Sequence, residues 1–141
     1  MTDIANLLPH AGTARMIERV VRWDSEEIVA ATARHRASLN PLRRAGRLAS
    51  VHLAEFAAQV MAIHGGLRNA AEGRDPESAL LVSLRDLVLR RDYLEDLPGE
   101  LEISARALLL QPGSWQYSFT VTHAGNVIAT GRVAAMAQSL P

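Results

Sequence analysis

The sequence predicts an α+β domain in which one long, buried helix is covered by an antiparallel sheet of about six strands. Three observations carry this prediction. A nearly uninterrupted apolar run spans residues 51–63, two strand-like segments precede it, and four strand-like segments with short connections follow it. Because no second helix is available to cover the sheet, the sheet has to wrap around the single helix. This arrangement is the hotdog architecture.

The strands are recognised by alternating apolar and polar residues and by the turns between them. In the segment 114–123, apolar residues occupy every second position, so one face is predicted to be buried and the other to face water. The predicted strands are Arg15 to Trp23, Glu27 to Arg36, Ala79 to Arg91, Glu100 to Leu110, Ser114 to His123 and Val127 to Gln138. The predicted turns are Asp24-Ser25, Pro98-Gly99, Pro112-Gly113 and Gly125-Asn126, and a loop is predicted from Asn69 to Ser78.

Composition favours one domain, residues 1–141, and excludes several classes of function. Fifteen basic residues, all arginine, balance fifteen acidic ones, which gives no general case for nucleic-acid or membrane binding. The absence of cysteine excludes disulfides, thiolate catalysis and cysteine-ligated metals. No apolar run is long enough to cross a membrane and no export signal is evident, so a cytoplasmic location is expected. Nucleotide and metal motifs are missing, and we expect no metal.

Three polar residues interrupt the apolar helix and share one of its faces. His52, Glu55 and Gln59 are spaced by three and four residues, which places them within an arc of about 60°. A buried carboxylate is costly unless it is hydrogen-bonded or lines a polar cavity, where it can act as a general acid or base. Two interpretations stay open. Glu55 acts in catalysis, or it pairs with an arginine of a strand or a partner subunit in a structural network.

The residues around this helix carry weaker signals. Ser50 is expected to cap the helix N-terminus. His64, beside a glycine pair, is expected to contact carbonyls of the last turns, and His10 to be mainly structural. His35 and His123 lie at the ends of predicted strands and are expected to be exposed.

The segment LLPHAGTARMIERV, residues 7–20, followed by HLAEFAAQ, residues 52–59, resembles the β-hydroxyacyl-acyl carrier protein dehydratases of the hotdog superfamily. The stretch 40–66 is most similar to the divergent branch associated with aryl-polyene biosynthesis clusters. The motifs are confined to residues 7–20 and 40–66, whereas the order of elements agrees over the whole chain.

The resemblance implies dehydration of a 3-hydroxyacyl thioester, carried by acyl carrier protein, to the trans-2-enoyl thioester, in fatty acid or polyene-type biosynthesis. It implies no cofactor, and a homodimer or higher homo-oligomer whose subunits share the site. Carried onto this chain, Glu55 is the general acid or base and Gln59 an orienting, substrate-binding residue. Gly46 is expected to approach the thioester, whose carbonyl a backbone N–H near the helix N-terminus would polarise.

The sequence departs from the family where the catalytic histidine is expected. Alignment places Asn40 there, and an asparagine cannot exchange a proton at neutral pH. Either His52, one helical turn before Glu55, is the second catalytic group and Asn40 binds substrate, or the chain does not dehydrate. The alternatives are a hotdog acyl thioesterase in which Glu55 activates water, and a non-catalytic acyl-binding or dimerisation subunit paired with a complete paralogue.

Basic residues cluster around the loop before the helix. Arginine suits bidentate contact with phosphate, and a carrier protein is acidic with a phosphopantetheine arm. We therefore expect Arg43, Arg44 and Arg47 to form a carrier-protein docking surface. The alternative is a solvated loop whose arginines pair with Glu26, Glu27 or the helix dipole. The whole cluster comprises Arg34, Arg36, Arg43, Arg44 and Arg47.

Overall fold

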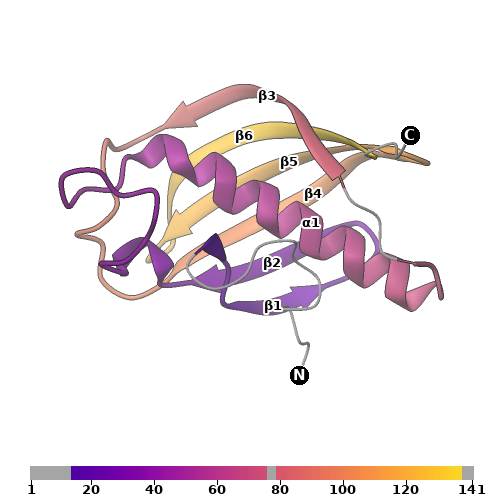
Figure 1. The fold of residues 1–141 in the computed structure, drawn as a ribbon, viewed down its shortest axis with the longest axis horizontal. Coiled ribbons are helices and arrows are strands. Elements are labelled where there is room, and N and C mark those ends of the chain that lie inside the picture. Colours follow the sequence, from indigo (N-terminus) through magenta and orange to yellow (C-terminus); the bar gives the residue numbers. More distant parts are fainter. Residues whose placement is uncertain (1–13, 76–78, 138–141) are drawn as a thin grey trace.

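The computed structural model describes residues 14–75 and 79–137, and its elements follow the predicted order. An antiparallel six-stranded sheet carries helix α1 across one face (Figure 1). This is the predicted hotdog fold. The elements are β1 (Arg19–Trp23), β2 (Glu27–Thr32), α1 (Leu53–Ala71), β3 (Ala79–Leu89), β4 (Leu101–Gln111), β5 (Ser114–His123) and β6 (Asn126–Ala137), with 3₁₀ turns at Arg34–Arg36 and Ser50–His52.

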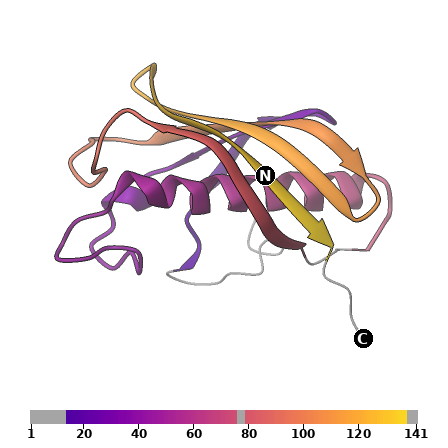
Figure 2. The ribbon, with the colours of Figure 1, turned by 90° about the horizontal axis from the view of Figure 1, so that it is seen from above.

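The strand order in the sheet is β1-β2-β4-β5-β6-β3. Strand β3 follows the helix in sequence but pairs with β6, so the chain crosses the sheet between β2 and β3. The sheet curves over the helix, as the view from above shows (Figure 2). The chain segments that lead into α1 lie at one end of this curved layer (Figure 1). They form the candidate site.

The core lies between α1 and the concave face of the sheet. Apolar residues recur along the helix at the spacing that keeps them on the sheet side, and the buried strand residues come from β2, β4, β5 and β6. Full burial of such a side chain stabilises the fold by about 1.5–3 kcal/mol. Fully buried members of this core are Ile28, Phe56, Val60, Ile63, Ile103 and Val121.

The helix is longer than the sequence predicted. It continues through Gly65 and Gly66 to Ala71, so the predicted loop at Asn69 begins three residues too early. Gly73, at φ 69°, then ends the helix: its N–H bonds to the Ala70 carbonyl, and the Arg74 N–H bonds to the Asn69 carbonyl. This is the Schellman arrangement that favours glycine. None of the described helices is long and apolar enough to cross a membrane.

Three predicted strands are shorter than expected, and the one after the helix ends at Leu89 rather than Arg91. The first begins at Arg19 rather than Arg15, and the second ends at Thr32 rather than Arg36. After Thr32 the chain turns through Arg34–Arg36, because the Thr32 hydroxyl oxygen accepts the Arg34 N–H at 3.0 Å. This turn carries His35 inward, so the prediction that His35 is exposed was wrong: its side chain is 0% exposed.

Candidate active site

The loop before the helix is organised by Asn40, which is only 6% exposed. Its Oδ1 accepts the Leu42 N–H at 2.9 Å, and its Nδ2 donates to the Arg34 carbonyl at 3.0 Å. Nδ2 also lies 3.3 Å from Met16 Sδ. Both ends of the amide therefore hold the backbone of this loop together.

The loop reverses direction at Ala45 and Gly46, which both have positive φ, 52° and 75°. Arg44 and Arg47 exchange backbone hydrogen bonds of 2.8 and 2.9 Å across this two-residue turn. Such turns require φ > 0 at both central residues, which favours glycine. The turn gives Gly46 a conformational role, and its approach to a thioester stays a prediction.

A segment after β3 holds this loop in place. The Ser50 N–H donates to the Asp92 carbonyl at 2.8 Å, and the Leu94 N–H donates to the Leu48 carbonyl at 2.9 Å. Glu95 Oε1 accepts the Leu48 N–H at 2.7 Å. This hydrogen bond, with the nearby Arg47 guanidinium, lowers the pKa of the Glu95 carboxyl.

Arg47 lines a pocket beside the helix N-terminus. Its guanidinium carbon lies 3.4 Å from the centroid of the Tyr93 ring, and its Nε lies 3.6 Å from Glu95 Oε2. The pocket has a volume of about 260 Å³ and brings together a histidine, two arginines and a tyrosine ring. Its lining residues are Leu42, Arg44, Ala45, Arg47, Ala49, His52 and Tyr93.

His52 precedes the first residue of α1 and is half-buried. It occupies the position expected for Ser50, so the prediction that Ser50 caps the helix was wrong. The 3₁₀ turn over Ser50–His52 shifts the helix start, and the Ser50 hydroxyl donates instead to the Arg91 carbonyl. His52 makes no side-chain capping bond and faces the pocket.

Glu55 and Gln59 lie one turn apart on α1 and are directly bonded. Gln59 Nε2 donates to Glu55 Oε1 at 3.1 Å and to the Ala14 carbonyl at 2.9 Å, while Gln59 Oε1 accepts the Met16 N–H at 2.7 Å. Gln59 is 2% exposed and Glu55 is half-buried. Gln59 thus fixes the Glu55 carboxylate to the chain segment that precedes β1.

The structure therefore brings only part of the predicted polar face of the helix into one site. Glu55 and Gln59 are brought together, whereas His52 lines the neighbouring pocket with Arg44 and Arg47. Glu55 is not one of the described residues that line this pocket.

The three arginines assigned to docking differ in their contacts. Arg43 donates to the Gly46 and Arg36 carbonyls at 3.0 and 2.9 Å, and Arg44 donates to the Pro41 carbonyl at 3.1 Å. Glu26 and Glu27 pair with Arg106 instead. Within residues 14–75 and 79–137, Arg43 and Arg44 have no carboxylate partner, whereas the charge of Arg47 is partly balanced by Glu95.

His64 is buried in the core rather than at exposed carbonyls of its own helix. Its Nε2 donates to the Asp24 carbonyl at 2.7 Å, so in the neutral ring Nδ1 accepts the Tyr117 hydroxyl hydrogen. Burial lowers the pKa of His64 and raises the pKa of Tyr117 to about 12. These neutral, mutually bonded groups are a structural element of the core.

His35 and His123 both support the segment before β4. His35 Nε2 donates to the Leu97 carbonyl at 2.9 Å, and His123 Nε2 donates to the Pro98 carbonyl at 2.8 Å. Burial lowers the pKa of His35. His10 lies outside the described residues. No group of three or more potential metal ligands occurs among residues 14–75 and 79–137.

The buried histidines predict acid sensitivity. The pKa values of His35 and His64 are lowered in the folded state, so the unfolded chain binds protons more readily once the pH falls below about 6.5. Their contribution to stability is therefore complete above about pH 6.5 and is lost as the pH falls toward the folded pKa values. Thermal unfolding monitored by circular dichroism should show Tm decreasing from pH 7 to pH 5.

Two matched substitutions separate the effect of the buried histidines from general acid denaturation. His64→Gln should flatten the dependence of Tm on pH, whereas His123→Gln, at the exposed carbonyl of Pro98, should leave its slope unchanged. Glu95 and Glu100, whose pKa values are lowered, titrate below this range. A wild-type Tm that is constant from pH 7 to pH 5 contradicts the prediction.

Two residues of this region were missed from the sequence. Tyr93 stacks on Arg47, and Glu95 anchors Leu48, yet both belong to an irregular charged segment without periodicity. One available signal was composition: Tyr93 is one of only two tyrosines in a chain that is 4% aromatic. An aromatic residue in a charged loop marks a contact surface.

Comparison with known proteins agrees with this architecture. Residues 2–140 match the ApeP-like family, described as ApeP dehydratase. A solved dehydratase heterocomplex ApeI:P from Xenorhabdus doucetiae is similar with a TM-score of 0.89 and 18% identity, over 99% of this chain and 93% of that one. No curated protein sequence matches the chain.

Thioesterases share the fold at greater distance. A mutant thioesterase from Pseudomonas aeruginosa is similar with a TM-score of 0.59 and 16% identity, over 86% of this chain and 81% of that chain. A hypothetical thioesterase from Streptococcus pneumoniae, solved with coenzyme A, is similar with a TM-score of 0.60 and 10% identity, over 86% of this chain and 85% of that chain. These likenesses establish the hotdog fold, and the match over nearly the whole sequence shows that the chain belongs to the ApeP-like dehydratase family.

Proposed function

We propose that this chain takes part in dehydration of a 3-hydroxyacyl thioester, presented by acyl carrier protein, to the trans-2-enoyl thioester in fatty acid or polyene-type biosynthesis. One observation carries the proposal. Glu55, in the first turn of the central helix, has its carboxylate fixed by Gln59 at 3.1 Å, one helical turn from a histidine that lines a pocket. The family match over residues 2–140 supports the same class of reaction.

The reaction needs two proton transfers and no cofactor. One group removes a proton from C2, the C2–C3 double bond forms, and the C3 hydroxyl leaves as water after protonation by a second group. We assign these two steps to Glu55 and His52. A backbone N–H near the start of α1 would stabilise negative charge on the thioester oxygen, because the helix N-terminus carries partial positive charge.

This assignment calls for an assembly of subunits. His52 lines a pocket that does not include Glu55 among its described lining residues, and we propose that a partner subunit completes a cavity common to both. Strand β3 is an edge strand with exposed apolar side chains, a surface typical of pairing with another strand. The exposed residues are Leu80, Leu81, Val82, Leu84, Val88 and Leu89. We propose a dimer formed through this edge.

A second candidate is supported by Asn40. Its amide is buried and bonded at both ends, so the position of the family histidine is filled by a structural residue. In this case the chain is a subunit without its own dehydration activity, paired with a catalytically complete paralogue. The similar ApeP-type structure is a heterocomplex, which supports this candidate. The thioesterase alternative is supported only by the shared fold.

One assay distinguishes these candidates. The purified chain is incubated with 3-hydroxyacyl and plain acyl thioesters of acyl carrier protein, alone and with a complete paralogue. Formation of the enoyl thioester by the chain alone supports the dehydratase, and release of free thiol supports a thioesterase. Activity only in the mixture supports the non-catalytic subunit. Native mass spectrometry of the same samples reports whether a homodimer or a mixed complex forms.

The carrier-docking proposal predicts a salt-dependent effect of Arg44. Because Arg44 has no carboxylate partner in the described residues, Arg44→Gln removes an uncompensated positive charge beside the pocket. We expect binding of acyl carrier protein to weaken several-fold at low salt and the difference to shrink near 1 M salt, where charges are screened. Isothermal titration calorimetry measures both conditions.

Arg22→Gln is the matched control for Arg44, because it removes the same charge from exposed strand β1. Arg43 is a poorer test, since its bonds to the Gly46 and Arg36 carbonyls hold the loop itself. Equal affinity of wild type and Arg44→Gln at low salt excludes Arg44 from the docking surface.

A further inference from the structure

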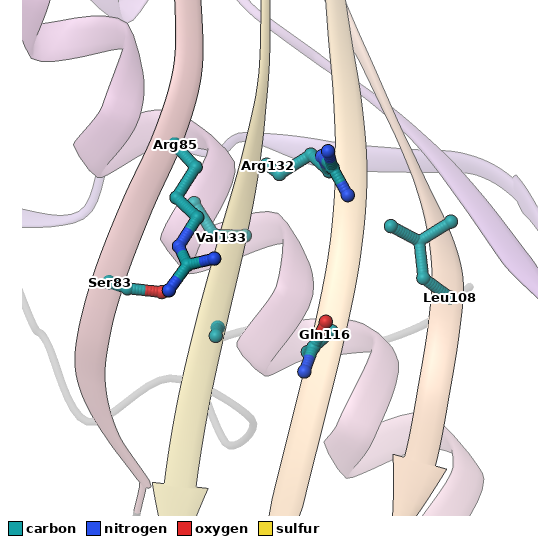
Figure 3. Close-up of a pocket in the computed structure, with 7 residues that line it drawn as sticks. Ser83, Arg85, Leu108, Gln116, Arg132 and Val133 are labelled. Atoms are coloured by element: carbon teal, nitrogen blue, oxygen red, sulfur yellow. The ribbon is translucent and has the colours of Figure 1, made fainter.

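A second polar hollow lies on the face of the sheet that points away from α1 (Figure 3). It has a volume of about 120 Å³ and is formed by four adjacent strands, β3, β6, β5 and β4. The helix lies on the opposite face, so the hollow is separate from the pocket that contains His52. Its lining residues are Ser83, Arg85, Leu108, Gln116, Arg132, Val133 and Ala134.

The strand register explains why a hollow forms here. Ser83 on β3 and Gln116 on β5 both pair with Ala134 on β6, so a small residue stands between two longer side chains in one row. Two residues along the same strands, Arg85 pairs with Arg132 in the next row. Side chains two residues apart share a face of the sheet. The two rows therefore surround the short Ala134 side chain with polar groups.

The charges around this hollow are unbalanced. Arg85 and Arg132 are directly opposite each other, an arrangement in which like charges repel. Arg132 is neutralised by Asp86, with Nη2 and Nε at 2.8 and 2.9 Å from Oδ2. In the part of the chain that the structure describes, Arg85 has no carboxylate partner. One positive charge therefore remains at the hollow.

Hydrogen-bond donors also remain available. Arg85 extends along β3 toward Ser83, and Gln116 faces the same hollow from β5 (Figure 3). Within the described residues, no hydrogen bond engages the side chains of Ser83, Arg85 or Gln116, and Arg132 uses only Nε and Nη2. Guanidinium, amide and hydroxyl donors around one net positive charge match the oxygens of a tetrahedral anion.

We propose that this hollow binds a phosphate group, either inorganic phosphate or the phosphate of a monoester. Arg85 supplies the charge, Arg132 and Gln116 supply further N–H donors, and Ser83 supplies a hydroxyl. The bound anion neutralises the remaining charge of Arg85 and so links edge strand β3 to β6. The site stands independently of the proposed dehydration.

The test measures phosphate binding to the intact chain. Inorganic phosphate is titrated against chloride at equal ionic strength, with the ³¹P line width and the Tm as readouts. Phosphate should bind the wild type and raise Tm by mass action. Arg85→Gln should weaken binding by roughly tenfold or more, since it removes charge-assisted hydrogen bonds. Arg22→Gln, which makes the same charge change on strand β1, should bind phosphate as wild type does.

A further variant tests shape without changing charge. Ala134→Leu fills the floor of the hollow and leaves both arginines in place, so it should also abolish binding. Glycerol 3-phosphate, titrated in parallel, shows whether the site accepts a monoester or only the free ion. The proposal is overturned if phosphate fails to bind the wild type, or if Arg85→Gln and Arg22→Gln weaken binding equally. It is also overturned if Ala134→Leu binds phosphate normally.

Discussion

Glu55→Gln is expected to lower the kcat for dehydration by about 10²- to 10⁴-fold, the usual contribution of a positioned general acid or base. The substitution keeps the size of the side chain, and the new amide oxygen can still accept the hydrogen that Gln59 donates at 3.1 Å. The substitution removes the negative charge and the ability to exchange a proton. The measurement is enoyl thioester formation on carrier-bound substrate, with KM determined separately.

The control for this variant lies at the far end of the same helix. Glu72→Gln makes the same change at the residue that follows α1, where Glu72 pairs with Arg74 at the surface, and it should leave kcat unchanged. If Glu55→Gln retains wild-type turnover, Glu55 has no catalytic role. If wild type and variant are both inactive alone, and equally active when mixed with a complete paralogue, the chain is a non-catalytic subunit.

The parts of the fold that follow regular periodicity could be predicted from the sequence. Strand β5 and the first part of β4 alternate apolar and polar residues, and β6 is rich in apolar residues. The bounds of these three strands differ from the prediction by no more than one residue at each end. The shared helix face of Glu55 and Gln59 follows from a four-residue spacing and is confirmed by their hydrogen bond.

The parts that depend on individual side-chain hydrogen bonds could not be predicted. His35 is buried because the chain turns after Thr32, and the turn depends on a side-chain hydroxyl rather than on a pattern. The Glu95 carboxylate accepts the N–H of Leu48, which is 47 residues away in sequence, and the Asn40 amide donates to the Arg34 carbonyl. Such hydrogen bonds form only once the chain is folded, so the periodicity of the sequence does not predict them.

Gln59→Leu is expected to lower the free energy of unfolding by about 2–4 kcal/mol. Leucine is close in size to glutamine, so the packing is kept. It leaves the Met16 N–H and the Ala14 carbonyl without the partners that Gln59 supplies. A buried donor or acceptor left unpaired costs about 1–3 kcal/mol. Urea unfolding measures the loss, and Gln111→Leu at the exposed end of β4 should change stability by less than about 0.5 kcal/mol.

The same variant tests whether Gln59 positions Glu55 for the proposed catalysis. In the folded protein Gln59 also holds Glu55, so its loss should lower kcat more than it raises KM. The assay is run well below the Tm of Gln59→Leu, where nearly all molecules are folded. A merely structural Gln59 predicts wild-type kcat under these conditions, because only the folded fraction would have changed. A lowered kcat in a fully folded sample instead requires that the carboxylate of Glu55 has lost its orientation.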